Sequence, residues 1–247
     1  MPIDKGLHNC GIMCSMPDIS CVICAYMEAP RIGAVLSAVA GHPLLTEIIV
    51  VDDGSTDATA AVVSRFPSVT LLRQVENQGK SRALAAGLRA ASGELVLCLD
   101  ADLKHLTPAD ISALGEPVLS GEADMSISIR QNSLPIYRAI GLDFVSGERL
   151  IPRTLLATHF EEIEKLPPFG IESFMNGRII EEKLRIRIVR LENVINTRKS
   201  EKMGAWRGTL ADWKMAIDVL RAISPLEIIR QNYAMLALSR CAWQGSR

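Results

Sequence analysis

Two aspartates directly follow a strongly apolar run of the chain. Residues 95–99 read LVLCL, and Asp100 and Asp102 come next, one residue apart. Two carboxylates this close repel each other unless a cation or a hydrogen-bonding ligand lies between them. Carboxylate oxygens suit a divalent cation that keeps several waters and shares phosphate oxygens of a substrate. Because Thr107 already supplies a cap for the next helix, the pair predicts a site for a metal and a phosphorylated ligand.

Polar side chains also follow the other three apolar runs of the first half. Tyr26 and Glu28 follow the first run, Asp52 and Asp53 the second, and Lys80 the third. One aspartate suffices for the Asp-Gly-Ser turn that follows, so a second carboxylate is available to a base or a ribose. Lys80 is placed either to meet a phosphate at a helix N-terminus or to be an ordinary exposed lysine.

Strand-like and helix-like segments alternate through the first half. The expected strands are residues 18–26, 46–53, 68–74 and 93–100, and the expected helices are residues 30–41, 55–66 and 80–92. The strands are apolar throughout, which indicates a parallel sheet buried by helices on both faces. Ligands of such open α/β sheets bind beyond the carboxyl ends of the strands, where the polar residues lie. The glycine fingerprint of dinucleotide-binding oxidoreductases is missing.

The second half is less regular. We expect a strand in residues 123–129, a loop that leads into a helix in 143–158, and a helix in 168–183. Residues 184–194 alternate like a half-exposed strand, and residues 208–223 and 225–243 read as two terminal helices. Residues 178–207 hold nine Lys and Arg against four Asp and Glu. This basic stretch is interpreted first as a solvated face, and otherwise as a strip for anionic lipid or a clamp for a phosphorylated acceptor.

Composition limits the classes of function. The chain has 247 residues, 48% of them apolar, and a net charge of −1, which argues against a general nucleic-acid binder. No apolar run approaches the roughly 18–20 residues of a membrane span. Cys21 and Cys24 lie three apart on an expected strand and therefore face opposite sides, which favours buried cysteines over a metal site. This usage fits a reducing cytoplasm, and residues 1–17 are expected to be a disordered leader.

Three segments together resemble family-2 glycosyltransferases of the GT-A fold. They read VICAYMEAPRIGAVL, EIIVVDDGSTDAT and NQGKSRALAAGLRAASGELVLCLDADL, in that order. The resemblance implies an α/β, Rossmann-like, mostly parallel sheet flanked by helices, with a C-terminal acceptor region and terminal helices. It divides a single domain, 18–247, into a nucleotide-sugar-binding half (18–106), an acceptor half (107–207) and C-terminal helices (208–247).

The resemblance also implies roles for the polar residues. Asp102 is expected to bind Mg²⁺ or Mn²⁺ on the diphosphate of a nucleotide-sugar, and Asp100 to contact the ribose or the metal. The residues expected to hold the nucleotide are Tyr26, Glu28, Asp52, Asp53 and Lys80. The chain departs from the first motif at Met27, where the family usually has Asn.

The acceptor region resembles two groups of enzymes. SGERLIPR followed by LPPFGIESFMN is similar to the retaining glucosyl-3-phosphoglycerate synthases, and SGERL also aligns with a loop of polyprenyl-phosphate sugar transferases. Either likeness places Glu148, Arg149 and Glu172 in the active site. In the phosphoglycerate enzymes a downstream histidine completes the metal site, whereas this chain offers only Asn196 in that stretch.

The prediction is a metal-dependent glycosyltransferase that moves a sugar from a nucleotide-diphosphate donor to an acceptor hydroxyl or phosphate. Glu172 is the first candidate for the general base, with Asp143 and Glu148 next, and Arg149 is expected to orient an anionic acceptor. The alternative is a non-catalytic nucleotide-sugar-binding relative. We expect a cytoplasmic protein, and leave open a peripheral contact with the inner membrane surface, a phosphorylated or lipid-linked acceptor, and a homo-oligomer.

Overall fold

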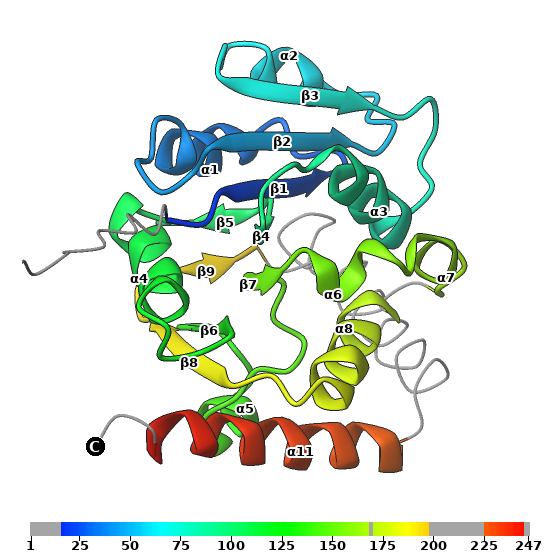
Figure 1. The fold of residues 1–247 in the computed structure, drawn as a ribbon. Coiled ribbons are helices and arrows are strands. Elements are labelled where there is room, and N and C mark those ends of the chain that lie inside the picture. The colour runs from blue at the N-terminus through cyan, green and yellow to red at the C-terminus, as the bar shows by residue number, and fades with distance from the viewer. Residues whose placement is uncertain (1–15, 168–169, 198–224, 245–247) are drawn as a thin grey trace, which may run out of the picture.

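The chain folds around a seven-stranded sheet in the order β3-β2-β1-β4-β7-β6-β8 (Figure 1). The computed structural model describes residues 16–167, 170–197 and 225–244. The strands are β1 (Ile19–Ala25), β2 (Glu47–Asp52), β3 (Val69–Arg73), β4 (Leu95–Asp100), β6 (Met125–Arg130), β7 (Arg149–Pro152) and β8 (Ile186–Leu191). Both pairs that involve β7 are antiparallel and the other four are parallel. A second, two-stranded sheet pairs β5 (Leu103–Lys104) with β9 (Ile195–Asn196).

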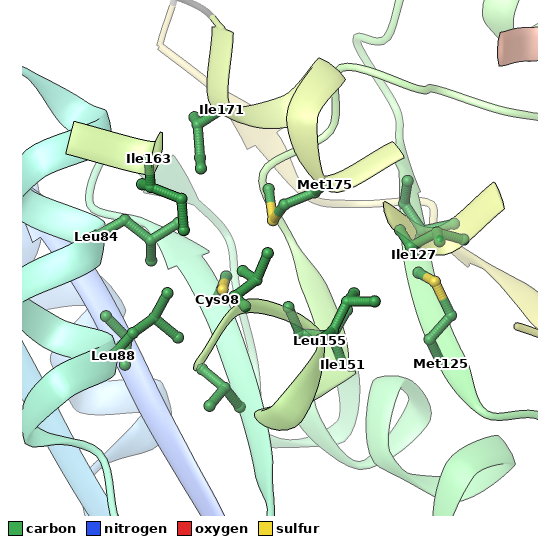
Figure 2. Close-up of a cluster of buried hydrophobic side chains, with 14 of the residues drawn as sticks. Leu84, Leu88, Cys98, Met125, Ile127, Ile151, Leu155, Ile163, Ile171 and Met175 are labelled. Carbon is green, nitrogen blue, oxygen red and sulfur yellow. The ribbon is translucent and has the colours of Figure 1, made fainter. Parts of the chain in front are cut away.

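Helices cover both faces of the sheet and bury two apolar clusters. The helices are α1 (Ile32–Val39), α2 (Thr59–Val63), α3 (Lys80–Ala90), α4 (Pro108–Leu119), α5 (Pro135–Ile140), α6 (Thr154–Ala157), α7 (Phe160–Glu164), α8 (Gly170–Glu181) and α11 (Pro225–Gln244). Helices α1 and α4 supply Ile32, Leu36 and Ile111 to one cluster. Figure 2 shows the other cluster, where Leu84 and Leu88 of α3 face Leu155 of α6 and Met175 of α8. This second cluster joins the two halves of the chain.

The cysteines of β1 lie on opposite faces of the sheet, as their spacing predicts. Cys21 belongs to the cluster under α1, whereas Cys24 packs against the cluster under α3. Burial raises the pKa of both thiols, and it raises the pKa of Cys98 to about 12. The three thiols are therefore core groups, and the two of β1 cannot bind one metal ion together. Cys10 and Cys14 lie outside the described residues.

The structure confirms the alternating strands and helices of the first half, with one shorter helix. Helix α2 covers only Thr59–Val63, and no side chain caps it from its N-cap position. Asp57 instead accepts a hydrogen bond from the Thr59 amide at 2.9 Å. The first residues of the expected helix therefore form a turn. The cap predicted at Thr107 is present, as a capping box with Asp110, so neither Asp100 nor Asp102 is needed as a helix cap.

The second half contains a strand that the sequence prediction missed. Residues 149–152 were expected to lie in a loop, but they form β7 in the middle of the sheet. Four residues are too few for periodicity to reveal a strand, and this one is stabilised by neighbours on both sides. The strand, helix and half-exposed strand predicted near 123–129, 168–183 and 184–194 are present as β6, α8 and β8. The helix expected in 208–223 lies outside the described residues, as does most of the expected leader.

Glu47 fastens the amino end of β2 to the turn before β4. Its carboxylate accepts hydrogen bonds from Ser20 Oγ at 2.5 Å and from the Ser92 amide at 2.6 Å. Burial raises the pKa of Glu47, but these hydrogen bonds outweigh it and leave the pKa below its ordinary value.

Glu47→Gln is expected to lower the free energy of unfolding by about 1–2 kcal/mol at pH 7, because the bonds to a charged acceptor are lost. A carboxyl whose pKa is depressed in the folded state stabilises fully above its unfolded pKa, and loses this effect as the pH falls through the folded value. The difference between wild type and variant should therefore shrink below about pH 4. Urea unfolding at pH 7 and pH 3.5 checks this, and an equal difference at both values contradicts it.

Candidate functional site

Lys80 joins carboxylates from the two halves of the chain. Its Nζ lies 2.8 Å from Asp100 Oδ1, at the carboxyl end of β4, and 2.8 Å from Glu172 Oε1, in the first turn of α8. Gly79 precedes α3 with a φ of +92°, a conformation that favours glycine, and this turn sets Lys80 as the first residue of the helix. Three residues predicted separately from the sequence therefore meet at one point.

The charges at this point support one another. Burial lowers the pKa of Lys80, but the carboxylates of Asp100 and Glu172 outweigh it and hold the pKa well above its ordinary value. Lys80 is therefore a cation throughout the physiological range. Its side chain is 42% exposed, so the lysine lies at the protein surface. The arrangement suits a negatively charged ligand that arrives beside a carboxylate.

Asp53 holds the loop that leads to Lys80. Its two carboxylate oxygens accept hydrogen bonds from the Gln78 and Gly79 amides, each at 2.8 Å. Asp52 lies deeper, is fully buried, and accepts a bond from the Ser55 amide at 3.0 Å. The turn chemistry expected for one aspartate thus belongs to Asp52, and Asp53 positions the entrance of α3.

Tyr26, Met27 and Glu28 line the loop that follows β1. The Met27 amide donates to Ser55 Oγ and the Glu28 amide to Thr59 Oγ1, each at 2.9 Å. Tyr26 is exposed, whereas the Glu28 side chain is buried and paired with Arg31. Hydroxyls of the turn after β2 and of the first residue of α2 therefore fix the backbone of this loop and leave the Tyr26 ring exposed.

Met27 adopts a left-handed backbone conformation with a φ of +57°. Asn populates this region more readily than Met, and the family resemblance gives Asn at this position. Met27→Asn is therefore expected to raise the free energy of unfolding by about 0.5–1 kcal/mol. Urea unfolding checks this, with Met27→Ala as the control, because alanine removes the same side chain but keeps the backbone penalty. Equal stabilities of the Asn and Ala variants would contradict the explanation.

A buried ionic network adjoins Asp100, and its arginine, Arg130, was not singled out from the sequence. Arg130, the last residue of β6, has Nη1 2.9 Å from Glu148 Oε1 and 3.7 Å from Asp100 Oδ2. Its Nη2 lies 3.5 Å from Asp143 Oδ2. Burial lowers the pKa of Arg130, but these carboxylates outweigh it and raise the pKa. The signal in the sequence that could have identified Arg130 is a charged residue at the end of a buried strand.

Glu148 and Arg149 are completely buried beside this network. Glu148 also accepts hydrogen bonds from Ser128 and Ser146, both at 2.7 Å. Arg149 donates to Phe144 O, Ser146 O and Asn176 Oδ1, at 2.6, 2.7 and 2.6 Å. The sequence placed both residues in contact with an acceptor, but their polar atoms are committed inside the protein. In the structure, Glu148 and Arg149 hold the loop 141–148 through their hydrogen bonds to Phe144 and Ser146.

The loop 141–148 passes very close to Asp100. A Cβ atom at Gly147 would lie 2.6 Å from Asp100 Oδ1, so a side chain there would require the Asp100 carboxylate to move. The Asp100 side chain is 23% exposed and faces cations from two directions, Lys80 and Arg130. These two cations balance the charge of the Asp100 carboxylate.

The small sheet of β5 and β9 places the stretch around Asn196 next to Asp102. Asn196 pairs with Leu103, and Thr197 Oγ1 donates to the backbone oxygen of Asp102 at 3.1 Å. The Asn196 side chain is held by Asn132 Nδ2 at 2.9 Å. The stretch in which a metal-binding histidine was sought is therefore adjacent to Asp102, and its polar side chain there is an amide.

The side chains that could bind a metal ion here suit a cation whose other ligands come mainly from a substrate. Within the described ranges, no group of three or more His, Cys, Asp and Glu side chains is arranged to hold a metal ion by itself. Asp100 and Asp102 nevertheless offer hard oxygen ligands at the carboxyl end of β4, and Mg²⁺ and Mn²⁺ complete such a shell with phosphate oxygens and water. A nucleoside diphosphate would supply those oxygens.

The described part of the basic stretch is mostly paired. Arg178 pairs with Glu181 and Glu182 on its own helix. Arg185 pairs with Asp124 and Arg187 with Glu122 across the sheet edge, at 2.8 and 2.9 Å. These arginines form the solvated face that the sequence indicated first. Residues 198–207 lie outside the described residues.

Comparison with known proteins identifies the family. The model of glycosyl transferase family 2 matches residues 20–143, which is half of the chain. The chain belongs to this family. The family match ends within the loop that carries Asp143, so it covers Lys80, Asp100, Asp102 and Arg130 but not Glu172.

Two curated relatives and one solved structure extend the likeness. Dolichyl-phosphate beta-glucosyltransferase ALG5C of Trichomonas vaginalis is 33% identical over 50% of this chain and 44% of its own length. Dolichol-phosphate mannosyltransferase of Mycosarcoma maydis is 29% identical over 57% of this chain and 53% of its own. Glucosyl-3-phosphoglycerate synthase from Mycobacterium tuberculosis, in complex with Mn²⁺ and UDP-glucose, is 26% identical with a TM-score of 0.61 over 80% of this chain and 78% of its own.

The likeness establishes the fold more firmly than the chemistry. This family 2 chain spans about half the length of the two curated relatives. It shares the GT-A architecture of the solved synthase across both halves. No described helix has the length and hydropathy to cross a membrane.

Proposed function

We propose that this protein transfers a sugar from a nucleotide-diphosphate donor to a phosphorylated acceptor, with a divalent cation bound at Asp102. The observation that carries the proposal is the contact of Lys80 with both Asp100 and Glu172. It brings a donor-side carboxylate and an acceptor-side carboxylate to one ammonium group at the carboxyl edge of the sheet. A site split between the two halves of the chain suits a reaction between two bound substrates.

We assign the residues of the donor side to the metal ion, the diphosphate and the nucleotide. Asp102, with Asp100, would hold Mg²⁺ or Mn²⁺, and the cation would neutralise charge on the departing diphosphate. Lys80 supplies a second positive charge beside that group. Asp53 positions the loop before Lys80, and the exposed Tyr26 ring, with Glu28 in the same loop, would contact the nucleotide.

Glu172 is our candidate for the general base. It lies on the acceptor side, is 8% exposed, and is oriented by Lys80. If the acceptor reacts through a hydroxyl, Glu172 removes its proton. If the reacting group is a phosphate oxygen, no base is required and Glu172 serves to orient Lys80. Glu148 and Arg149 act through the network beside Asp100 and are positioning residues.

The names of the relatives support a phosphorylated acceptor. Both curated relatives are named for a dolichol phosphate, and the solved synthase is named for a phosphoglycerate. That synthase was crystallised with Mn²⁺ and UDP-glucose, which supports UDP-glucose and Mn²⁺ as the first donor and cation to test here. The position of Glu172 against Lys80 favours an enzyme over a binding protein that has lost its acceptor chemistry.

A thermal-shift series with UDP, GDP, ADP, CDP and their common sugars, each with and without Mn²⁺, tests the proposal. One nucleotide should stabilise wild type only with Mn²⁺, and Asp102→Ala should remove the shift. Glu116→Ala is the matched control, because Glu116 is an exposed carboxylate on α4, and it should keep the shift. Failure of every nucleotide to stabilise wild type would overturn the proposal.

A further inference from the structure

A polar pocket of about 290 Å³ lies at the carboxyl ends of β6 and β8. Its lining consists of Ile129, Arg130, Gln131, Arg138, Arg190 and Glu192. Three arginines against one glutamate give the pocket a net charge of +2, which suits a dianion. Strands β6 and β4 run in the same direction, because both are antiparallel to β7. The pocket is therefore on the same edge of the sheet as Asp100 and Asp102.

Arg130 connects the pocket with the candidate active site. Its guanidinium reaches Glu148 at 2.9 Å and lies 3.7 Å from Asp100, while the residue also lines the pocket. The side chain is only 7% exposed, yet its Nε has no hydrogen-bond partner among the described residues. A buried N–H donor without an acceptor is uncommon and needs an explanation. The Arg130 guanidinium therefore keeps hydrogen-bonding capacity that the described residues do not use.

Arg138 and Arg190 supply the outer part of the pocket. Arg138 lies on α5 and Arg190 on β8, and both are exposed. Within the described part of the chain, neither side chain has a hydrogen bond or an ion pair. Arg185 and Arg187, on or next to the same strand, are both paired with acidic residues. Two exposed arginines beside one pocket can both turn toward an oxyanion, which a guanidinium binds through two hydrogen bonds.

We propose that Arg130, Arg138 and Arg190 form a binding site for the phosphomonoester of the acceptor. This inference rests on the proposed function and adds to it the residues that recognise the acceptor. Arg130 links the bound phosphate to Asp100, and so couples occupancy of the acceptor site to the donor site.

The phosphate can come from a soluble metabolite or from a lipid, and α5 bears on the choice. Ile136 and Ile140 are 59% and 38% exposed and lie four residues apart on this helix, hence on one side of it. The apolar chain of a lipid acceptor could pack against these two isoleucines. The experiment therefore includes both kinds of phosphate.

Calorimetric titrations of the full chain with inorganic phosphate, glycerol 3-phosphate and polyprenyl phosphate in detergent micelles test the site. The double variant Arg138→Gln/Arg190→Gln should weaken binding of the phosphate that wild type prefers by about a hundredfold, or about tenfold for each arginine. Arg65→Gln, an exposed arginine after α2 near the opposite edge of the sheet, should bind as wild type does. Urea midpoints of all three proteins should agree.

Binding of UDP with Mn²⁺, measured on the same samples, separates this inference from the proposed function. The double variant should keep the wild-type affinity for UDP while it loses the phosphate. Preference for glycerol 3-phosphate or for polyprenyl phosphate identifies the source, and either supports the site. Equal phosphate affinities of wild type and double variant, or no affinity of wild type for any of the three phosphates, would overturn the site even where UDP binds. Absence of binding of UDP, GDP, ADP and CDP in wild type would count against the proposed function instead.

Discussion

Lys80→Met is expected to reduce the release of UDP from UDP-glucose by about a hundredfold or more, because the diphosphate loses a positive charge that is already in place. The same variant should bind Mn²⁺ alone about tenfold more tightly or better. Asp100 and Glu172 both lie 2.8 Å from the lysine nitrogen, and without it two carboxylates face each other with no cation between them. A metal ion can then take the place of the ammonium group.

The opposite signs of these two effects make the Lys80 experiment specific. Loss of folding would weaken UDP release and Mn²⁺ binding together. Loss of the lysine charge alone should weaken UDP release and strengthen Mn²⁺ binding. UDP release is measured with excess Mn²⁺, and Mn²⁺ binding by calorimetry without nucleotide. Lys165→Met removes an exposed lysine after α7 and should change neither. Unchanged UDP release, or weaker Mn²⁺ binding in Lys80→Met, would contradict the role given to this lysine.

Arg149→Met is expected to lower the free energy of unfolding by about 3–5 kcal/mol, because three buried acceptors lose their donors at roughly 1–3 kcal/mol each. The arginine is completely buried, and its guanidinium satisfies Phe144 O, Ser146 O and Asn176 Oδ1 at 2.6–2.7 Å. Methionine fills much of the volume but leaves these acceptors buried without donors. Because domains are stable by only about 5–15 kcal/mol, the variant should unfold at a much lower urea concentration.

Two further variants identify the cause of the Arg149 effect. Arg65→Met removes an exposed arginine and should change the free energy of unfolding by less than about 0.5 kcal/mol. Arg149→Lys keeps the charge but donates in fewer directions, and it should fall between wild type and Arg149→Met. A loss of less than about 1 kcal/mol in Arg149→Met would show that the network beside Asp100 does not depend on this side chain.

The donor half was predictable because its signals are local. Each apolar strand and amphipathic helix in residues 18–100 leaves its own pattern in the sequence. The parallel order then places the ends of β1, β2 and β4 on one edge, which brings Asp53, Lys80 and Asp100 into one region. The contact between Lys80 and Asp100 follows from topology, although its distance does not.

The acceptor half was harder to predict because its key contacts join residues far apart in the sequence. Strand β7 has four residues, and it is held by β4 on one side and β6 on the other. Arg130 becomes central only when β6 places it against Glu148 and Asp100. A single sequence gives no sign of which buried carboxylate meets which arginine. Glu148 and Arg149 were therefore assigned to the acceptor, whereas the fold commits them to the interior.

The most direct test of the central claim is diffraction from crystals grown with UDP and Mn²⁺, recorded at the manganese absorption edge. An anomalous peak is expected beside the Asp102 carboxylate at the carboxyl end of β4, in contact with the diphosphate and with Lys80 nearby. That result would place donor and metal where this account puts them. A nucleotide bound without a manganese peak beside Asp102, or bound away from Lys80, would contradict it.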